Sequence, residues 1–241
     1  LAQICADKFG VDISAITANV GDTGKIANGV GSFASRIAVN AGNSVHLAAE
    51  AVRKKAIKVA SHVLEAAEED LDIIDGKVTV NGVPDLSITL ADISRAVQGM
   101  PGFALPGGVE PGLESTQYFS PTQAAYCNGT AIVELEVDVE TGAVTILYYV
   151  MAHDSGNLIN PMVVDGQIRG ATAHGIGNAL YERLIYDKDA QPQTTTFADY
   201  LLPTAHEIPP IDVVHTESPT PMNPLGVKGA GEGGTIPAPA A

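Results

Sequence analysis

The sequence predicts an α+β protein of two lobes, each built from mixed helices and small sheets. A helical spacing of apolar residues runs through residues 43–71. Two alternating apolar patterns surround tight-turn signals, one at Asp75 and Gly76 and one at residues 140–142. A connection rich in Gly and Pro over residues 99–114 separates these features. We therefore expect a first lobe over residues 1–112 and a second over residues 113–241.

The first lobe opens with short elements and a long loop. Residues 1–10 have the apolar pattern of the end of a helix, and residues 13–20 predict a short strand before the turn signal at residues 21–24. Residues 24–42 mix Gly, Asn, Ser and Ala with neither a helical nor a strand period. Because loops longer than about 12 residues are usually functional or disordered, and this one carries few charges, we expect a functional loop.

The rest of the first lobe is more regular. The helical spacing predicts a long helix over residues 43–71, entered directly from the loop. Residues 71–83 alternate around Asp75 and Gly76, which predicts a hairpin, and residues 90–98 have the pattern of a short helix.

The second lobe is expected to contain a hairpin, a helix and two further strands. Residues 131–138 and 144–152 alternate around the turn, and Pro161 precedes a helical stretch over residues 162–180. Strands are predicted at residues 181–186 and 211–215, on either side of a long loop, and a Gly-rich turn follows at residues 226–234.

The charge balance excludes several partners. The 241 residues contain 13 Lys and Arg against 28 Asp and Glu, a net charge of −15, so nucleic acid and anionic membranes would be repelled. Cys5 and Cys127 stand far apart and provide neither a zinc framework nor a disulfide scaffold. Since there is no apolar run of about 18 residues and no signal peptide, we expect a cytoplasmic protein without a membrane span. The chain starts at Leu1 and closes on IPAPAA, which suggests an interior segment of a longer protein.

The first candidate binding segment is GVGSFASR, residues 29–36. Glycines allow a backbone to approach a ligand closely, and a helix start favours negative charge, so a phosphate or a polar heterocycle would fit. The alternative is a tight helix-entry loop without a ligand. The segment has neither the Gly-Lys-Ser/Thr of a phosphate-binding loop nor the later acidic residue of a dinucleotide fingerprint.

The second candidate is GVKGAGEGG, residues 226–234, in which Glu232 stands among five glycines and Lys228 precedes it. A carboxylate that close-packed backbone desolvates becomes more basic, which suits a general base. The alternative is a solvated Glu in a flexible linker, the usual meaning of Gly-rich sequence.

A third candidate is Gln167, within GQIRG on the predicted helix. An amide donates and accepts at once, which suits a heterocycle edge, although a buried amide that bonds to backbone is more common. The six histidines are dispersed without the spacing of a metal site, so we interpret them as structural or surface residues. They are His46, His62, His153, His174, His206 and His215.

Taken in order, these segments resemble a known family. Six motifs carry the resemblance: GDT at residues 21–23, GVGSFASR, HDSG at 153–156 with Asn160 and Pro161, GQIRG, FADYLLPTA at 197–205, and GVKGAGEGG. The succession is similar to the carboxyl-terminal part of the molybdopterin-binding large subunit of the xanthine dehydrogenase, aldehyde oxidase and carbon monoxide dehydrogenase family. The two predicted lobes would then be the lobes of a molybdopterin-binding domain.

The resemblance implies roles for individual residues. The loop that lines the cofactor and its phosphate would be Gly31, Ser32, Phe33, Ala34, Ser35 and Arg36, and Gln167 would contact the pterin. The loop around the metal would be Lys228, Gly229, Ala230 and Gly231, and Glu232 would be the catalytic carboxylate beside it. No protein side chain is expected to ligate the metal directly.

The resemblance also implies an activity and an assembly. The expected reaction is oxidation of an aldehyde, an N-heterocycle or carbon monoxide with water-derived oxygen. The expected cofactor is molybdopterin with molybdenum, the cytosine dinucleotide form being one option. Iron–sulfur clusters and FAD would lie on partner subunits or domains, in a dimer of heterotrimers that includes the rest of the large subunit. The alternatives are a non-catalytic α+β binding or assembly module and, less well supported by the motifs, a nucleotide-binding enzyme.

Overall fold

The computed structural model describes residues 1–26, 29–99 and 105–241. These residues form two compact units: unit 1 comprises Leu1–Gly31 and Asn40–Ser120, and unit 2 comprises Ser32–Val39 and Pro121–Ala241. The units do not coincide with the expected lobes, because Ser32–Val39 groups with unit 2. The lobes, as functional domains, stay a prediction.

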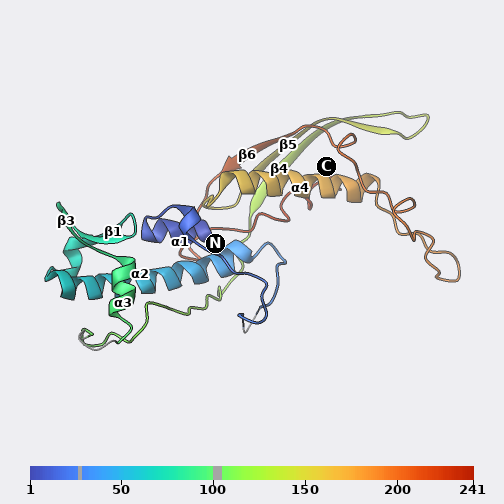
Figure 1. Ribbon diagram of the computed structural model, residues 1–241. Helices are drawn as coiled ribbons and strands as arrows, with labels where there is room; N and C mark the ends of the chain where they lie inside the picture. The colour runs from blue at the N-terminus through green and yellow to red at the C-terminus, as the bar shows by residue number, and fades with distance from the viewer. Residues whose placement is uncertain (27–28, 100–104) are drawn as a thin grey trace. The chain divides into compact units, whose positions relative to one another are not determined.

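Unit 1 combines three α-helices with a small antiparallel sheet, as Figure 1 shows. The helices are α1 (Ala2–Phe9), α2 (Asn43–Leu64) and α3 (Leu90–Ala96), with short 3-10 turns at Ile13–Ala15 and Glu68–Asp70. The strands, in sheet order, are β1 (Leu71–Ile74), β2 (Lys77–Val80) and β3 (Val83–Thr89). The predicted helices and the hairpin at Asp75 and Gly76 are thus confirmed.

Three details of unit 1 differ from expectation. Residues 13–20 form no strand: the Asp12 carboxylate accepts a hydrogen bond from the Ser14 N–H (2.8 Å), which favours a 3-10 turn. The long helix ends at Leu64 rather than at residue 71, because Glu65 adopts a left-handed conformation with φ 52°. Strand β3 was not expected at all, and it completes the sheet beside β2.

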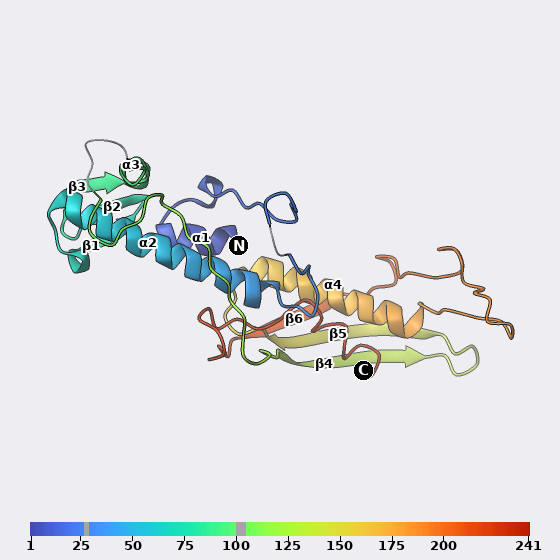
Figure 2. The same ribbon diagram turned by 90° about the horizontal axis from the view of Figure 1, so that it is seen from below.

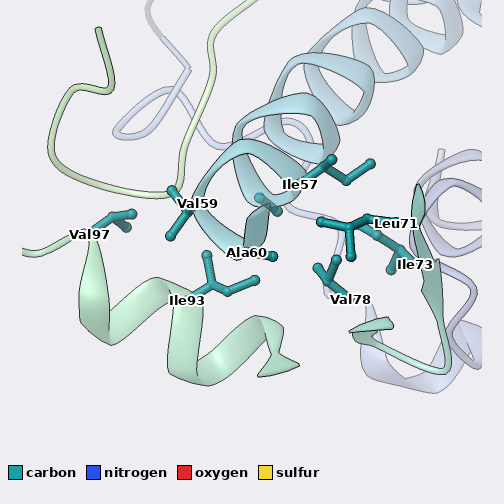
Figure 3. Close-up of a cluster of buried hydrophobic side chains, with 9 residues drawn as sticks. Ile57, Val59, Ala60, Leu71, Ile73, Val78, Ile93 and Val97 are labelled. Carbon is teal, nitrogen blue, oxygen red and sulfur yellow. The ribbon is translucent and has the colours of Figure 1, made fainter. Parts of the chain in front are cut away.

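Apolar side chains from α2, the sheet and α3 form the core of unit 1 (Figure 3). Ala56, Val59 and Ala60 are fully buried on one face of α2. Leu71, Ile73 and Val78 meet them from the sheet, and Ile93 and Val97 from α3 and the residue after it. The Thr89 hydroxyl begins α3 by accepting a hydrogen bond from the Asp92 N–H (3.0 Å).

Unit 2 is a three-stranded sheet with one long helix along one face (Figures 1 and 2). Strands β4 (Asn128–Val137) and β5 (Val144–Asp154) form an antiparallel hairpin, and β6 (Ile211–Thr216) pairs with β5 in parallel. Helix α4 (Pro161–Leu180) follows β5. The predicted hairpin, helix and last strand are confirmed, and the fold is α+β.

The core of unit 2 lies between α4 and the sheet. Tyr149 and Met151 of β5, Ile211 of β6, and Ile168 and Ile176 of α4 are buried there. The strand expected at residues 181–186 is wrong, since only Tyr186 forms an isolated bridge, with Pro192. The N–H groups of residues 181 and 182 instead donate to the Gly177 carbonyl at the end of α4.

Two expectations involve residues that the structure does not describe. The predicted loop over residues 24–42 includes positions 27 and 28, and the predicted connection over residues 99–114 includes positions 100–104. The described end of the loop contains a π-helical turn, Ala38–Gly42, that leads into α2.

Among the helices of the described ranges, none is long and apolar enough to cross a membrane.

The core of unit 1 predicts a strong effect for Ile93→Ala. Ile93 is fully buried, so losing three carbons leaves a cavity and should lower the free energy of unfolding by about 2–5 kcal/mol. Leu86→Ala, on β3 and 41% exposed, is the control and should cost much less. Urea denaturation followed by circular dichroism measures both, and equal losses would contradict the assignment of this core.

Candidate functional site

Helix α4 supplies one wall of the candidate site in unit 2. It begins where the Asn160 side chain accepts a hydrogen bond from the Val163 N–H (3.1 Å) and Pro161 occupies the first helical position. Its apolar residues Ile168 and Ile176 face the sheet. Gln167 and Gly170 are exposed, so this side of the helix is open to a ligand.

A buried ion pair joins the end of β5 to the Gly-rich segment. The Lys228 ammonium lies 3.2 Å from Asp154 Oδ2, and both side chains are about 10% exposed. Asp154 Oδ1 accepts hydrogen bonds from the N–H groups of Gly156 (2.8 Å) and Ser218 (3.1 Å). Burial alone would raise the pKa of Asp154, but these hydrogen bonds and Lys228 outweigh it and hold the pKa well below its ordinary value.

Backbone hydrogen bonds join the HDSG turn to the Gly-rich segment. The Lys228 N–H donates to the Ser155 carbonyl (2.7 Å), and Gly156 forms an antiparallel bridge with Val227. The Asn223 amide donates to the Val227 carbonyl (2.9 Å). Gly156 has φ 69°, and a Cβ there would lie 2.2 Å from the Gly226 carbonyl oxygen, so only glycine fits. The start of residues 226–234 is therefore fixed.

The following glycines bring the segment against the loop that precedes α2 and against α4. A Cβ on Gly229 would lie 2.8 Å from Ser35 Cβ. A Cβ on Gly231 would lie 3.3 Å from both Ser35 Oγ and Gln167 Nε2. A Cβ on Gly234 would lie 2.6 Å from the Ile168 carbonyl oxygen. The three candidate segments of the sequence analysis thus meet around residues 229–231.

Ser35 presents an unsatisfied hydroxyl at this meeting point. Its Oγ is buried and has no hydrogen-bond partner among the described residues. Ala34 and Ser35 both have left-handed backbone conformations, with φ 51° and 53°, which are uncommon for residues other than glycine and tend to occur at functional sites. The Arg36 guanidinium stacks 4.1 Å from the centroid of the Phe33 ring.

A pocket of about 550 Å³ opens beside the Gly-rich segment. Glu232 and Gly231 line it together with Gln167 and His174 of α4. Its remaining lining residues are Gly170, Ala171, Thr235 and Ile236. Glu232 is exposed, so close-packed backbone does not desolvate its carboxylate as expected.

The structure brings together only part of the expected set. Ser35, Gln167 and the glycines at 229 and 231 are neighbours, with Glu232 next to them. Gly31 groups with unit 1, and the side chains of residues 32–34 are exposed. Lys228 is engaged in its ion pair with Asp154 rather than free to reach a ligand.

Sequence reasoning missed three residues of this region. Asp154 is the buried partner of Lys228, His174 lines the pocket, and His153 contacts Gly233. The HDSG motif contributes to the family resemblance. Nothing in its spacing, however, indicates that its Asp154 pairs with Lys228, which lies far along the chain. Throughout the described residues, no group of three or more His, Cys, Asp or Glu side chains could hold a metal ion. The expected absence of a direct protein ligand to the metal stays a prediction.

The family model for the molybdopterin cofactor-binding domain matches residues 1–209. This chain belongs to that family. The nicotine 6-hydroxylase large subunit of Paenarthrobacter nicotinovorans is 41% identical over 241 residues, covering all of this chain and 29% of the relative. The carbon monoxide dehydrogenase large chain of Hydrogenophaga pseudoflava is 35% identical, covering 98% of the chain and 29% of the relative.

Solved structures agree with this family membership. The crystal structure of quinoline 2-oxidoreductase from Pseudomonas putida 86 superposes with a TM-score of 0.90 at 41% identity, covering all of this chain and 30% of that one. The chain thus spans less than a third of the length of the relatives it matches. The family resemblance inferred from the six motifs is confirmed.

The buried ion pair predicts an acid-sensitive stability. The pKa of Asp154 is lower in the folded chain than the ordinary value near 4, so its contribution is present above about pH 4 and is lost as the pH falls below it. Asp154→Asn should lower the free energy of unfolding at pH 7 by about 3–5 kcal/mol, because Lys228 loses its buried partner. The same substitution should flatten the decline in stability below pH 4.

Urea unfolding from pH 7 to pH 2 measures both effects. Glu136→Gln, an exposed carboxylate on β4, is the control and should leave the stability at each pH nearly unchanged. A variant at Asp154 that kept the full acid dependence would contradict the assignment.

Proposed function

We propose that this chain forms the part of a molybdenum hydroxylase large subunit that holds the pterin cofactor and supplies the catalytic base. The observation that carries the proposal is the position of Gly231, where backbone, the Ser35 hydroxyl and the Gln167 amide converge beside Glu232. Such a convergence of backbone and polar side chains next to a pocket is typical of a cofactor site.

The residues at this point fit an organic cofactor with polar edges. The buried Ser35 Oγ lacks a partner within the described parts of the chain, and a buried hydroxyl normally has one. Gln167 can both donate and accept, and the Arg36 guanidinium suits bidentate pairing with a phosphate. Ser35, Gln167 and the backbone of residues 229–231 would therefore hold the pterin, and Arg36 its phosphate. When bound, the molybdenum cofactor would supply two-electron oxidation chemistry.

Glu232 is the group that we assign to proton transfer. Its side chain lines the pocket. The residues on either side of it in the chain, Gly231 and Gly233, are both in close contact with other segments. A carboxylate at a fixed position can accept a proton from a water-derived oxygen nucleophile as that nucleophile attacks the substrate. Fixed backbone contacts reduce the entropy that must be lost to place such a base.

The substrate class that we favour is an N-heterocycle. The two relatives at 41% identity are named for nicotine and quinoline, whereas a relative at 35% is named for carbon monoxide. Both nicotine and quinoline contain an electron-poor ring carbon beside a nitrogen, which a water-derived nucleophile can attack. Aldehydes and carbon monoxide are the other candidate substrates.

We also propose the wider assembly that the family implies. The remaining part of the large subunit would complete the site, since the relatives are more than three times as long as this chain. Iron–sulfur and FAD-bearing subunits would accept the electrons, in a dimer of heterotrimers, with the cofactor in its cytosine dinucleotide form. The free Cys5 and Cys127 support a cytoplasmic location.

The assignment of Glu232 predicts a selective loss of turnover. In the intact enzyme, Glu232→Gln keeps the size of the side chain but removes its basicity, so kcat should fall by about 10²- to 10⁴-fold while molybdenum content is unchanged. Glu140→Gln, an exposed carboxylate in the β4–β5 turn, is the control. Normal turnover by the Glu232 variant with full cofactor would favour the flexible-linker interpretation.

The assignment of Ser35 and Arg36 predicts a loss of cofactor instead. Ser35→Leu would place a bulky side chain in the close contact between residue 35 and Gly229, and Arg36→Glu would repel a phosphate. Both variants should therefore bind less molybdenum and pterin. The iron–sulfur absorption of the intact complex should stay unchanged. Metal analysis and release of the pterin measure the effect, and full cofactor content in both variants would refute this part of the proposal.

A further inference from the structure

His153 is a buried imidazole that the proposed chemistry leaves without a role. It lies near the end of β5 and is 1% exposed. Its Nδ1 forms a hydrogen bond with the Ser155 hydroxyl (2.8 Å), which fixes the orientation of the ring. Its Nε2 is buried and finds no hydrogen-bond partner in the described ranges. The free edge of the ring is therefore available for packing against another segment.

That edge packs directly against the residue after Glu232. A Cβ on Gly233 would lie 2.4 Å from His153 Nε2 and 2.8 Å from its Cδ2, so the glycine backbone rests on the ring. Gly233 lies outside the left-handed region of φ, which means that space rather than backbone conformation requires a glycine here. The contact is thus specific to the pairing of this imidazole with this glycine.

A second contact holds the next residue of this backbone against α4. A Cβ on Gly234 would lie 2.6 Å from both the Ile168 carbonyl oxygen and Thr172 Oγ1 of α4. The Thr235 hydroxyl donates to the Ala171 carbonyl (2.9 Å). The residues after Glu232 therefore contact both the ring of His153 and helix α4.

The surroundings of His153 disfavour the protonated form of its ring. Burial lowers the pKa of His153, and the neighbouring His215 and Lys228 lower it further, while Asp154 opposes them. His215 is the register partner of His153 on β6, and its Nε2 lies 3.8 Å from Asp165 Oδ1 of α4. The ring, held by its bond to Ser155, offers the glycine backbone a flat, rigid surface.

We propose that His153 is a positioning residue for Glu232, and that its ring sets the place of the carboxylate by supporting Gly233. The inference rests on the proposed role of Glu232 as the base. It predicts that replacing the His153 ring by a shorter side chain, or adding a methyl group at Gly233, displaces the carboxylate. Combining the two changes should restore part of the packing between these positions.

The test uses three variants of the intact enzyme: His153→Asn, Gly233→Ala and the double variant. Asn keeps a polar atom near Ser155 but removes the ring edge that contacts Gly233. Each single change should lower kcat per molybdenum by about 10- to 100-fold with KM and molybdenum content unchanged, because small displacements of a catalytic group have effects of this size. The double variant should turn over faster than Gly233→Ala alone, since the methyl then has room.

Hydrogen–deuterium exchange supplies a readout that does not depend on activity. In the complete large subunit prepared without cofactor, His153→Asn should raise exchange in the peptide that contains residues 230–235, while exchange in the peptides of α2 stays unchanged. His206→Asn, at an exposed histidine of the same unit, is the control and should change neither kcat nor exchange.

Glu232→Gln, assayed in parallel, separates the two hypotheses. If Glu232→Gln loses turnover but the His153 and Gly233 variants keep the wild-type kcat, the inference about His153 is wrong and the base stands. Strictly additive losses in the double variant would also overturn the inference. If Glu232→Gln keeps full turnover, both the base and its positioning residue are rejected.

Discussion

The close approach of residues 229–234 to three other segments is the constraint on which the candidate site depends. A methyl group on Gly229, Gly233 or Gly234 would lie within 3 Å of Ser35, His153 or helix α4. The absence of side chains therefore lets one short segment touch a loop, a strand end and a helix at once. Because those segments lie far apart in the sequence, their meeting defines the site, and Glu232 belongs to the Gly-rich segment and lines the pocket beside it. Glycine-rich sequence is often a flexible linker, but here the glycines permit close packing.

The buried pair of Asp154 and Lys228 anchors this arrangement at its start. The pair lies where β5 ends, and the two N–H donors to Asp154 leave its carboxylate well satisfied. A buried ion pair contributes little net stability compared with an apolar alternative, but losing one partner is costly. We therefore interpret the pair as a device that fixes the register of the Gly-rich segment against the HDSG turn. The backbone bonds between Ser155 and Lys228 and between Gly156 and Val227 follow from that register.

Sequence periodicity predicted the regular elements and failed where local side chains decide. The hairpin of β4 and β5 follows from alternating apolar residues, and helix α4 from a stretch of apolar and small residues after Pro161. Asp75 with Gly76 marked the first hairpin. The strand expected at residues 13–20 was wrong, because the Asp12 carboxylate accepts a hydrogen bond from the Ser14 N–H and so favours a 3-10 turn. In the site, the amide of Gln167 and the carboxylate of Glu232 could be singled out by residue type and neighbouring glycines. His153 could not be singled out in this way, because its proposed role depends on its contact with Gly233, which only the folded chain creates.

The most direct test of the central claim is a crystal structure of the intact, cofactor-loaded large subunit. The account predicts that Ser35 Oγ and the Gln167 amide lie within about 2.7–3.2 Å of polar atoms of the cofactor. It also predicts that the backbone of residues 229–231 contacts the cofactor and that the Glu232 carboxylate faces it. A cofactor bound elsewhere, with Ser35 Oγ still lacking a partner and the Gly-rich segment far from it, would contradict the account.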